Sequence, residues 1–417
     1  MILQCRNHRT CNRERVASVA LAILFTTSLV TLQPGAIGAE PVEEATGQNL
    51  ASARFEEMGV AWLPSTPFQI IAGVDVGYDD NATIGSNAEG SLFTRENVVL
   101  TYDRPGESTQ FYVLGIGRFS QYFDVTGQND HSGNVTLSLT HNFSTRLSFY
   151  ASVYAAYQTE PNFKSNVGPE NVRSPHFDTT DIFSLTYHWL LRFATVTNYT
   201  LERVQYTSSS VGNSQNRIQN TLSEEFQFNL TSRTNLVSEY RFQMINYDTA
   251  SNNSTTQYIL AGVDHHLTEH LIFHVRGGES FRSLENDGDM ANPYFESSLG
   301  YVSSNHSLLW TSSYGFESST GAGVTTTKTW RTGLTLSYGL TSRISSTAAV
   351  YYHHDENQGG TGSTGTQDSF DLTLGLRYTI NKRFALHADY NHTTLGSLGS
   401  TPGYSRNIYS LGLNYTY

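Results

Sequence analysis

The sequence predicts an all-β fold: a transmembrane, antiparallel, up-and-down β-barrel of about 18 strands, with 16 strands as the alternative. The composition favours strands joined by turns, because the 417 residues include 25 Tyr and 22 Phe, which favour strands, and 34 Gly, which favours turns, but only three Lys. Apolar and polar residues alternate along most of the chain, as the two faces of a strand require. Helical membrane crossing is excluded, because a spanning helix needs about 20 apolar residues and the best run covers only residues 16–30.

Residues 1–39 have the features of a secretory signal peptide. Four Arg residues precede an apolar run over residues 16–32, and Gly38 and Ala39 offer a cleavage site. Cys5 and Cys11 leave with this segment, so the mature chain has no thiol for disulfides, thiolate metal sites or a cysteine nucleophile. Loss of the four Arg and Glu14 takes the formal net charge from −12 to −15, which argues against a nucleic-acid partner.

The remaining chain divides into residues 40–67, predicted as a polar periplasmic segment, and residues 68–417, predicted as the barrel. Within residues 370–378 every even-numbered position is apolar or aromatic, and the odd positions are small, polar or charged. The same alternation recurs through residues 135–139, 147–157, 308–316, 334–338, 384–390 and 409–417.

Two kinds of connection alternate along the chain, and their number indicates 18 strands. Short polar turns are predicted near residues 105–106, 142–145, 190–191, 232–233, 267–269, 304–305, 340–342 and 381–382. Longer loops rich in Gly, Asn, Ser and Asp lie between them, such as residues 79–90, 159–178, 282–292, 355–367 and 393–405. An even number of antiparallel strands, with short turns at one end and long loops at the other, is typical of outer-membrane barrels.

Two checks agree with a membrane barrel. The eight residues from Phe370 to Tyr378 span about 20 Å at ~3.3 Å per residue and ~40° tilt, close to the ~25 Å apolar band of such barrels. The charges also fall in the register opposite the apolar stripe, where we expect them to line a water-filled lumen. These lumen-lining candidates are Glu239, Arg241, Arg276, Arg331, Asp371, Arg377 and Asp389. The alternative is that they pair across neighbouring strands and only stabilise the wall.

The strongest structural rival is a soluble β-propeller, because successive turns lie about 36 to 48 residues apart and a blade has a comparable period. Each period here holds two long strands, however, and a blade needs four shorter ones. The strand from Tyr409 to Tyr417 alternates and ends on an aromatic residue, like the strand by which outer-membrane proteins are recognised for insertion. We therefore expect three partners: the barrel-assembly machinery, outer-membrane lipid and lipopolysaccharide.

Three short segments resemble a known family. They are Gly73-Val74-Asp75-Val76-Gly77-Tyr78-Asp79-Asp80-Asn81, Glu239-Tyr240-Arg241-Phe242 and Gly262-Val263-Asp264-His265. They are similar to the opening hairpin and internal strands of a family of β-barrel porins of Gram-negative outer membranes, some linked to exopolysaccharide export. The resemblance covers nearly the whole mature chain and implies an outer-membrane barrel. It brings no defined substrate and no catalytic residues.

A weak divalent-cation site is a further candidate. Glu285, Asp287 and Asp289 supply oxygens at every second position, as calcium loops do, but no Glu stands at the closing position of an EF-hand. Such a site would cross-bridge anionic lipopolysaccharide, and a solvated acidic loop is the simpler interpretation.

Other chemistry is not supported by the sequence. His265, His266, His270 and His274 cluster, but strand residues four apart lie about 13 Å from each other, too far for one metal ion. No Gly-x-Ser-x-Gly stands at a strand-to-helix turn. We therefore expect no catalytic residue, no resident metal and no cofactor.

The sequence thus predicts an integral outer-membrane protein with both termini in the periplasm. The expected function is a porin-like channel for passive passage of hydrophilic solutes, or for export of polysaccharide. The longest loop, residues 159–178, is the candidate constriction. A non-conducting structural or surface-interaction barrel is the alternative, and a barrel-embedded lipid hydrolase is the second alternative.

Overall fold

The computed structural model describes residues 67–125, 129–160, 173–208, 215–248, 252–285, 288–318, 324, 326–359, 365–399 and 401–417. The predicted signal peptide, residues 1–39, lies outside this part of the chain, as do residues 40–66 of the predicted periplasmic segment. Both assignments therefore stay predictions. The described residues contain no helix long and apolar enough to cross a membrane.

Eighteen antiparallel strands form one sheet that closes on itself, which confirms the predicted all-β barrel and its strand count. Each strand pairs with its neighbours in sequence, and β1 also pairs with β18. A propeller is excluded, because its blades would be separate sheets. The strands are β1 (Phe68–Asp79), β2 (Ser91–Arg104), β3 (Thr109–Tyr122), β4 (Asp130–Asn142), β5 (Leu147–Gln158), β6 (His176–Leu190), β7 (Phe193–Tyr206), β8 (Arg217–Asn229), β9 (Thr234–Tyr247), β10 (Ser254–His266), β11 (Leu271–Leu284), β12 (Gly288–Val302), β13 (His306–Glu317), β14 (Thr326–Gly339), β15 (Ile344–Gln358), β16 (Gly365–Thr379), β17 (Phe384–Leu395) and β18 (Tyr404–Thr416).

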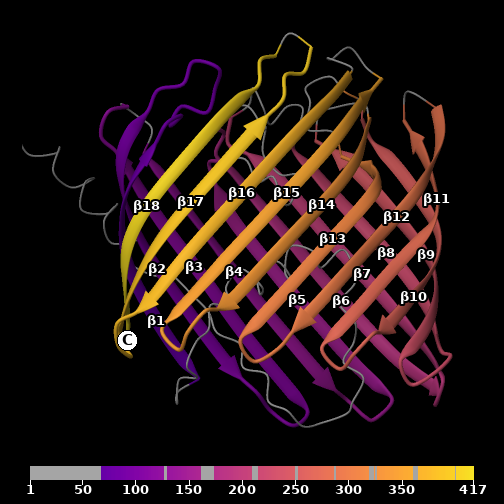
Figure 1. Ribbon diagram of the computed structural model, residues 1–417. Coiled ribbons are helices and arrows are strands. Elements are labelled where there is room, and N and C mark those ends of the chain that lie inside the picture. The colour runs from indigo at the N-terminus through magenta and orange to yellow at the C-terminus, as the bar shows by residue number, and fades with distance from the viewer. Residues whose placement is uncertain are drawn as a thin grey trace, which may run out of the picture.

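All eight short turns lie where the sequence places them, and they gather at the end of the barrel that also holds the C-terminus (Figure 1). A recurring local hydrogen bond explains five of them. In each, a Ser, Thr or Asn side-chain oxygen accepts from the backbone N–H two residues later, which fixes a tight reversal. The accepting residues are Ser144, Thr231, Thr268, Thr341 and Asn381.

Strand parity divides the wall into an apolar outer face and a polar inner face. On β1 the side chains of Val74 and Val76 are 55% and 54% exposed, whereas Asp75 and Asp79 are buried. Large apolar side chains are exposed at the corresponding outward positions of the other strands. These outward apolar side chains form the band that a membrane barrel presents to lipid, which is their favoured solvent.

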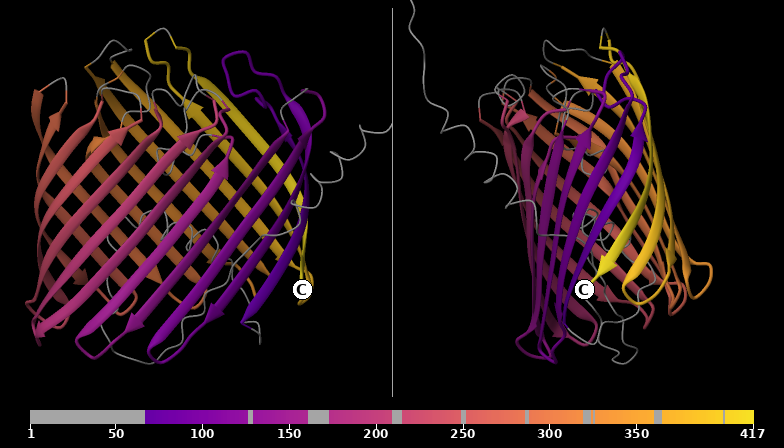
Figure 2. Two further views of the ribbon diagram at one scale, coloured as in Figure 1. Left: turned by 180° about the vertical axis from the view of Figure 1, so that it is seen from behind. Right: turned by 90° about the vertical axis from the view of Figure 1, so that its left-hand side faces the viewer.

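The barrel is flattened, as the two views of Figure 2 show. One narrow edge holds β18, β1 and β2, and the other holds β9, β10 and β11 (Figure 1). Strands β4 to β7 and β13 to β16 therefore form two broad walls that face each other. A circular barrel with 18 strands spaced ~4.8 Å apart and tilted ~40° would have a perimeter of about 110 Å.

A glycine allows two side chains to meet across the closing seam. His387 on β17 and Asp75 on β1 both lie opposite Gly412 of β18. His387 Nε2 lies 2.9 Å from Asp75 Oδ1, directly over the glycine. A Cβ at position 412 would collide with both side chains. Because Gly412 has no side chain, the contact between His387 and Asp75 can link β17 to β1 across β18.

We expect Gly412→Val to destabilise the barrel by about 1–3 kcal/mol, because the added atoms must displace His387 and Asp75. The measurement is the urea midpoint of the protein refolded in lipid vesicles. Gly300→Val is the matched control, since no atom lies within 4 Å of a Cβ built there. Equal losses in the two variants would remove the seam contact as the cause.

Candidate functional site

The inner face of the barrel carries the largest group of charged side chains. All seven lumen-lining candidates lie at inward positions. Carboxylates are the majority, and on the strands they are Asp75, Asp79, Asp103, Asp130, Asp178, Glu202, Glu225, Glu239, Asp264, Glu296, Glu317, Asp355, Asp371 and Asp389. The inward guanidiniums are Arg95, Arg118, Arg217, Arg241, Arg276, Arg282, Arg331, Arg377 and Arg406.

Arg241 is the centre of a buried ion cluster at the narrow edge of β9 to β11. Its Nε lies 2.6 Å from Glu239 Oε1 on the same strand, and its Nη2 lies 3.3 Å from Glu296 Oε1 on β12. Its Nη1 donates to the Tyr294 hydroxyl at 3.1 Å, and that hydroxyl donates to Glu296. The three ionised side chains are at most 7% exposed. The sharp curvature of this edge brings side chains three strands apart into contact.

Arg276 on β11 repeats this arrangement nearer the turns. Its Nη1 lies 2.5 Å from Asp264 Oδ1 on β10, and its Nη2 lies 3.5 Å from Glu225 Oε2 on β8. Arg331 on β14 is paired with Glu317 on β13 at 2.5 Å. These ion pairs are the contacts that the wall-stabilising interpretation expects, and the role of the guanidiniums stays a prediction.

The other three candidates lie differently. Asp371 accepts hydrogen bonds from Thr393 at 2.7 Å and Asn391 at 3.0 Å. The side chain of Asp389 is 44% exposed and lies 3.7 Å from His387. Arg377 is half-buried. Their expected role in a water-filled lumen stays a prediction.

Sequence reasoning missed the acidic partners of these arginines, namely Glu225, Asp264, Glu296 and Glu317. Asp264 lies in the Gly262-Val263-Asp264-His265 segment, and the alternation rule alone places all four on the inner face. The pairing of Glu225 and Glu296 could not be read from that rule, because contacts between strands three apart depend on the curvature of the closed sheet. The pairing of Asp264 and Glu317 depends on the register between adjacent strands.

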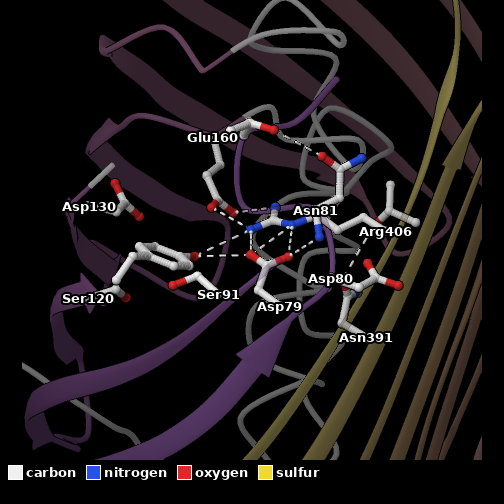
Figure 3. A network of polar contacts seen from close by, with 12 residues as sticks. Asp79, Asp80, Asn81, Ser91, Ser120, Asp130, Glu160, Asn391 and Arg406 are labelled. Atoms are coloured by element: carbon white, nitrogen blue, oxygen red, sulfur yellow. Dashed lines mark hydrogen bonds and ion pairs between the residues drawn. The ribbon is translucent and has the colours of Figure 1, made fainter. Parts of the chain in front are cut away.

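A second ion cluster ties the connection between β5 and β6 to the closing seam. Figure 3 shows the Arg406 guanidinium between the carboxylates of Asp79 and Glu160, at 2.6 Å and 2.9 Å respectively. Arg173 lies 2.8 Å from Glu160 and donates to the Tyr122 hydroxyl at 3.1 Å. Both ends of the predicted constriction loop are thus held at the inner wall. Its residues 161–172 lie outside the described chain.

Charge complementarity controls the ionisation of Glu160. Burial alone would raise the pKa of this carboxyl, but the adjacent Arg406 and Arg173 guanidiniums outweigh burial and hold its pKa well below the usual range. Glu160 therefore stays ionised at neutral pH and serves as a fixed anchor for the loop.

The remaining candidate sites do not assemble in the described part of the chain. Glu285 accepts a hydrogen bond from Asn253 at 2.7 Å, Asp289 is exposed at the start of β12, and Asp287 lies outside the described residues. No group of three or more His, Asp and Glu among the described residues could hold a metal ion. In the histidine cluster, His274 lies beside Asp264, and His265 contacts Thr234 at 3.0 Å.

Arg241→Met should destabilise the barrel by about 3–5 kcal/mol, because it leaves Glu239 and Glu296 buried without their counter-charge. Urea unfolding in vesicles measures the loss. The triple variant E239Q/R241M/E296Q removes all three charges and should recover most of the stability. A triple variant no more stable than R241M would show that the charges are not the cause.

Glu160→Gln should cost about 1.5–3 kcal/mol at neutral pH through weaker hydrogen bonds to two guanidiniums. Because the folded-state pKa is depressed, the stabilisation is complete above the ordinary value of about 4.5 and declines as the pH falls toward the folded-state pKa. The gap between wild type and variant in urea unfolding should therefore shrink between pH 5 and pH 3. Exposed Glu285→Gln is the control, and a constant gap would contradict the ion-pair explanation.

Comparison with protein-family models matches residues 71–417 to the family described as Putative beta-barrel porin 2. No curated protein matches the sequence. Similar solved structures include OccAB4 of Acinetobacter baumannii, with TM-score 0.40 and 10% identity over 84% of this chain and 98% of that chain. The outer membrane protein OpdK of Pseudomonas aeruginosa has TM-score 0.40 and 11% identity over 84% and 99% of the two chains. A bacterial polysaccharide outer membrane secretin has TM-score 0.34 and 9% identity over 85% and 100%.

These distant structures indicate nothing about what passes through this barrel. The family model, by contrast, covers the chain from the fourth residue of β1 to Tyr417, and the closed 18-stranded sheet agrees with it. The chain therefore belongs to the Putative beta-barrel porin 2 family and is an integral protein of the outer membrane.

Proposed function

We propose that this protein is a porin-like channel through which hydrophilic solutes diffuse passively across the outer membrane. One observation carries the proposal: a closed 18-stranded sheet has an apolar outer face and an inner face lined by carboxylates and guanidiniums. Barrels of 16 to 18 strands have an interior wide enough for water. Charged groups on such a wall set the electrostatic field that acts on permeating solutes.

We further infer the orientation of the barrel. The C-terminus lies at the end with the short turns (Figure 1), which in outer-membrane barrels faces the periplasm. The predicted signal peptide, residues 1–39, agrees with this orientation, because a secretory signal peptide of a Gram-negative protein delivers the chain to the periplasm. The strand Tyr409 to Tyr417 remains the proposed recognition element for the assembly machinery, with lipid and lipopolysaccharide around the outer face.

Export of polysaccharide is the narrower form of this function, suggested by the family resemblance. It needs a passage wide enough for an extended sugar chain, whereas passive uptake needs only room for small solutes. Liposome swelling with sugars of increasing length separates the two, because an exporter admits linear oligosaccharides that a narrow diffusion channel excludes.

A non-conducting structural barrel is the second candidate. The observation in its favour is the anchoring of the β5–β6 connection at Arg406, which holds both ends of that loop inside the barrel rim. We propose no enzymatic activity, and a lipid hydrolase stays the remaining alternative.

Reconstituted in a planar bilayer, the purified protein should produce stable stepwise ion conductance, because an open lumen admits hydrated ions. The control is the same protein left unfolded in urea before dilution into the chamber. Folded barrels that insert but never conduct would refute the channel and favour the structural barrel.

A further inference from the structure

We propose that the lumen favours cations, so that cationic and neutral hydrophilic solutes pass more readily than anionic ones. This inference rests on the proposed channel function and names the class of solute that the channel admits. It follows from the balance of charge on the inner wall, from the pairing of the guanidiniums and from the position of the remaining carboxylates.

The charges on the inner wall do not balance. Fourteen carboxylates but only nine guanidiniums occupy inward positions on the strands. The excess is located on the inner wall, where low-dielectric surroundings focus its field into the lumen. A solute inside the barrel is therefore exposed to a net negative wall.

Two of the inward guanidiniums are each paired with two carboxylates. Arg241 lies between two carboxylates, Glu239 and Glu296, and Arg276 lies between Asp264 and Glu225. Each of these clusters keeps one unit of negative charge after pairing. Arg241 and Arg276 are thus more than neutralised. Arg282 of β11 donates to the neutral acceptors Thr256, Thr326 and the Glu317 carbonyl, and its charge lowers the negative excess of the two clusters from two units to one.

Four inward carboxylates accept hydrogen bonds from neutral donors. Asp178 accepts from Gln158 at 3.0 Å, and Glu202 accepts from Gln219 at 2.7 Å. Asp355 accepts from Thr329 at 2.7 Å, and Asp371 accepts from Thr393 at 2.7 Å. Hydrogen bonds from amides and hydroxyls stabilise a carboxylate but leave its charge uncancelled.

These four carboxylates lie on opposite sides of the passage. Asp178 and Glu202 are on β6 and β7, and Asp355 and Asp371 are on β15 and β16, nine strands away around an 18-stranded barrel. The two broad walls face each other in the flattened barrel (Figure 2). On the first wall, Arg217 of β8 offsets one of the two carboxylates. On the second wall, Arg331 near Asp355 is already paired with Glu317, and Arg377 of β16 offsets one of the two carboxylates. A solute between the walls therefore meets net negative charge on both sides.

The expected selectivity follows from the size of such fields. A mean lumen potential of only −1 kT/e, at the low end of protein surface potentials, enriches K⁺ over Cl⁻ by about sevenfold. The preference should weaken in concentrated salt, because the Debye length falls from about 10 Å at 0.1 M to about 3 Å at 1 M.

The test is the zero-current potential of the full chain in a planar bilayer under a KCl gradient at pH 8, where carboxylates are ionised. We expect a K⁺/Cl⁻ permeability ratio of several-fold above one. The variant D178N/E202Q/D355N/D371N keeps the hydrogen-bonding shapes and should lower the ratio at least twofold. Asp181→Asn is the matched control, because Asp181 lies on β6 at an outward position, and its ratio should equal that of wild type.

A second measurement does not depend on the folding of any variant. In the wild-type channel, replacement of K⁺ by the bulky tetraethylammonium ion should lower conductance more than replacement of Cl⁻ by gluconate. A permeability ratio at or below one, or a ratio unchanged in the quadruple variant, overturns the cation preference and leaves the channel standing. Complete absence of conductance instead refutes the channel, and the inference falls with it.

Discussion

The need to satisfy every backbone hydrogen bond inside a membrane governs this structure. Hydrocarbon offers no partner to a free N–H or C=O, so a sheet can cross only if its first and last strands pair. Strand β1 meets β18 along a continuous register, from Ile71 opposite Thr416 to Asp79 opposite Ile408. That pairing fixes the parity of all 18 strands, because a shift of one residue would turn the acidic inner face toward lipid.

The alternation of outward and inward side chains explains the segment from Gly73 to Asn81, which resembles the porin family. In residues 73–79, Val74, Val76 and Tyr78 face outward, and glycine and aspartate alternate on the inner face. The small inward positions have a reason of their own, since Asn97 and Asn414 fill the space above Gly73. The resemblance therefore reflects the requirements of a closing strand: apolar contact with lipid, and room inside for polar links across the seam.

The sequence predicted those features of the fold that depend on residues close together in the chain. The eight turns, the 18 strands and the inward position of Asp371 all follow from alternation and from local turn chemistry, and the structure agrees with them. The sequence alone could not predict that Arg241 would contact Glu296, or that Arg406 would bind Glu160, which lies 246 positions away in the chain. The first contact joins strands three apart at the sharply bent edge, and the second joins β18 to the connection between β5 and β6. Both therefore depend on the closed barrel and not on residues that are near in sequence.

Flattening also separates two uses of charge. At the narrow edges the wall bends enough for opposite charges to touch, so guanidiniums and carboxylates pair, lose solvent and stiffen the sheet. On the broad walls Arg331 pairs with Glu317 of the next strand, whereas Asp178 and Asp371 accept hydrogen bonds from amides and hydroxyls. Paired charges hold the edges in shape, and uncancelled charges remain where solutes would pass. The bend of the barrel wall therefore brings Glu296 and Glu225 to guanidiniums three strands away, which the list of charged residues does not show.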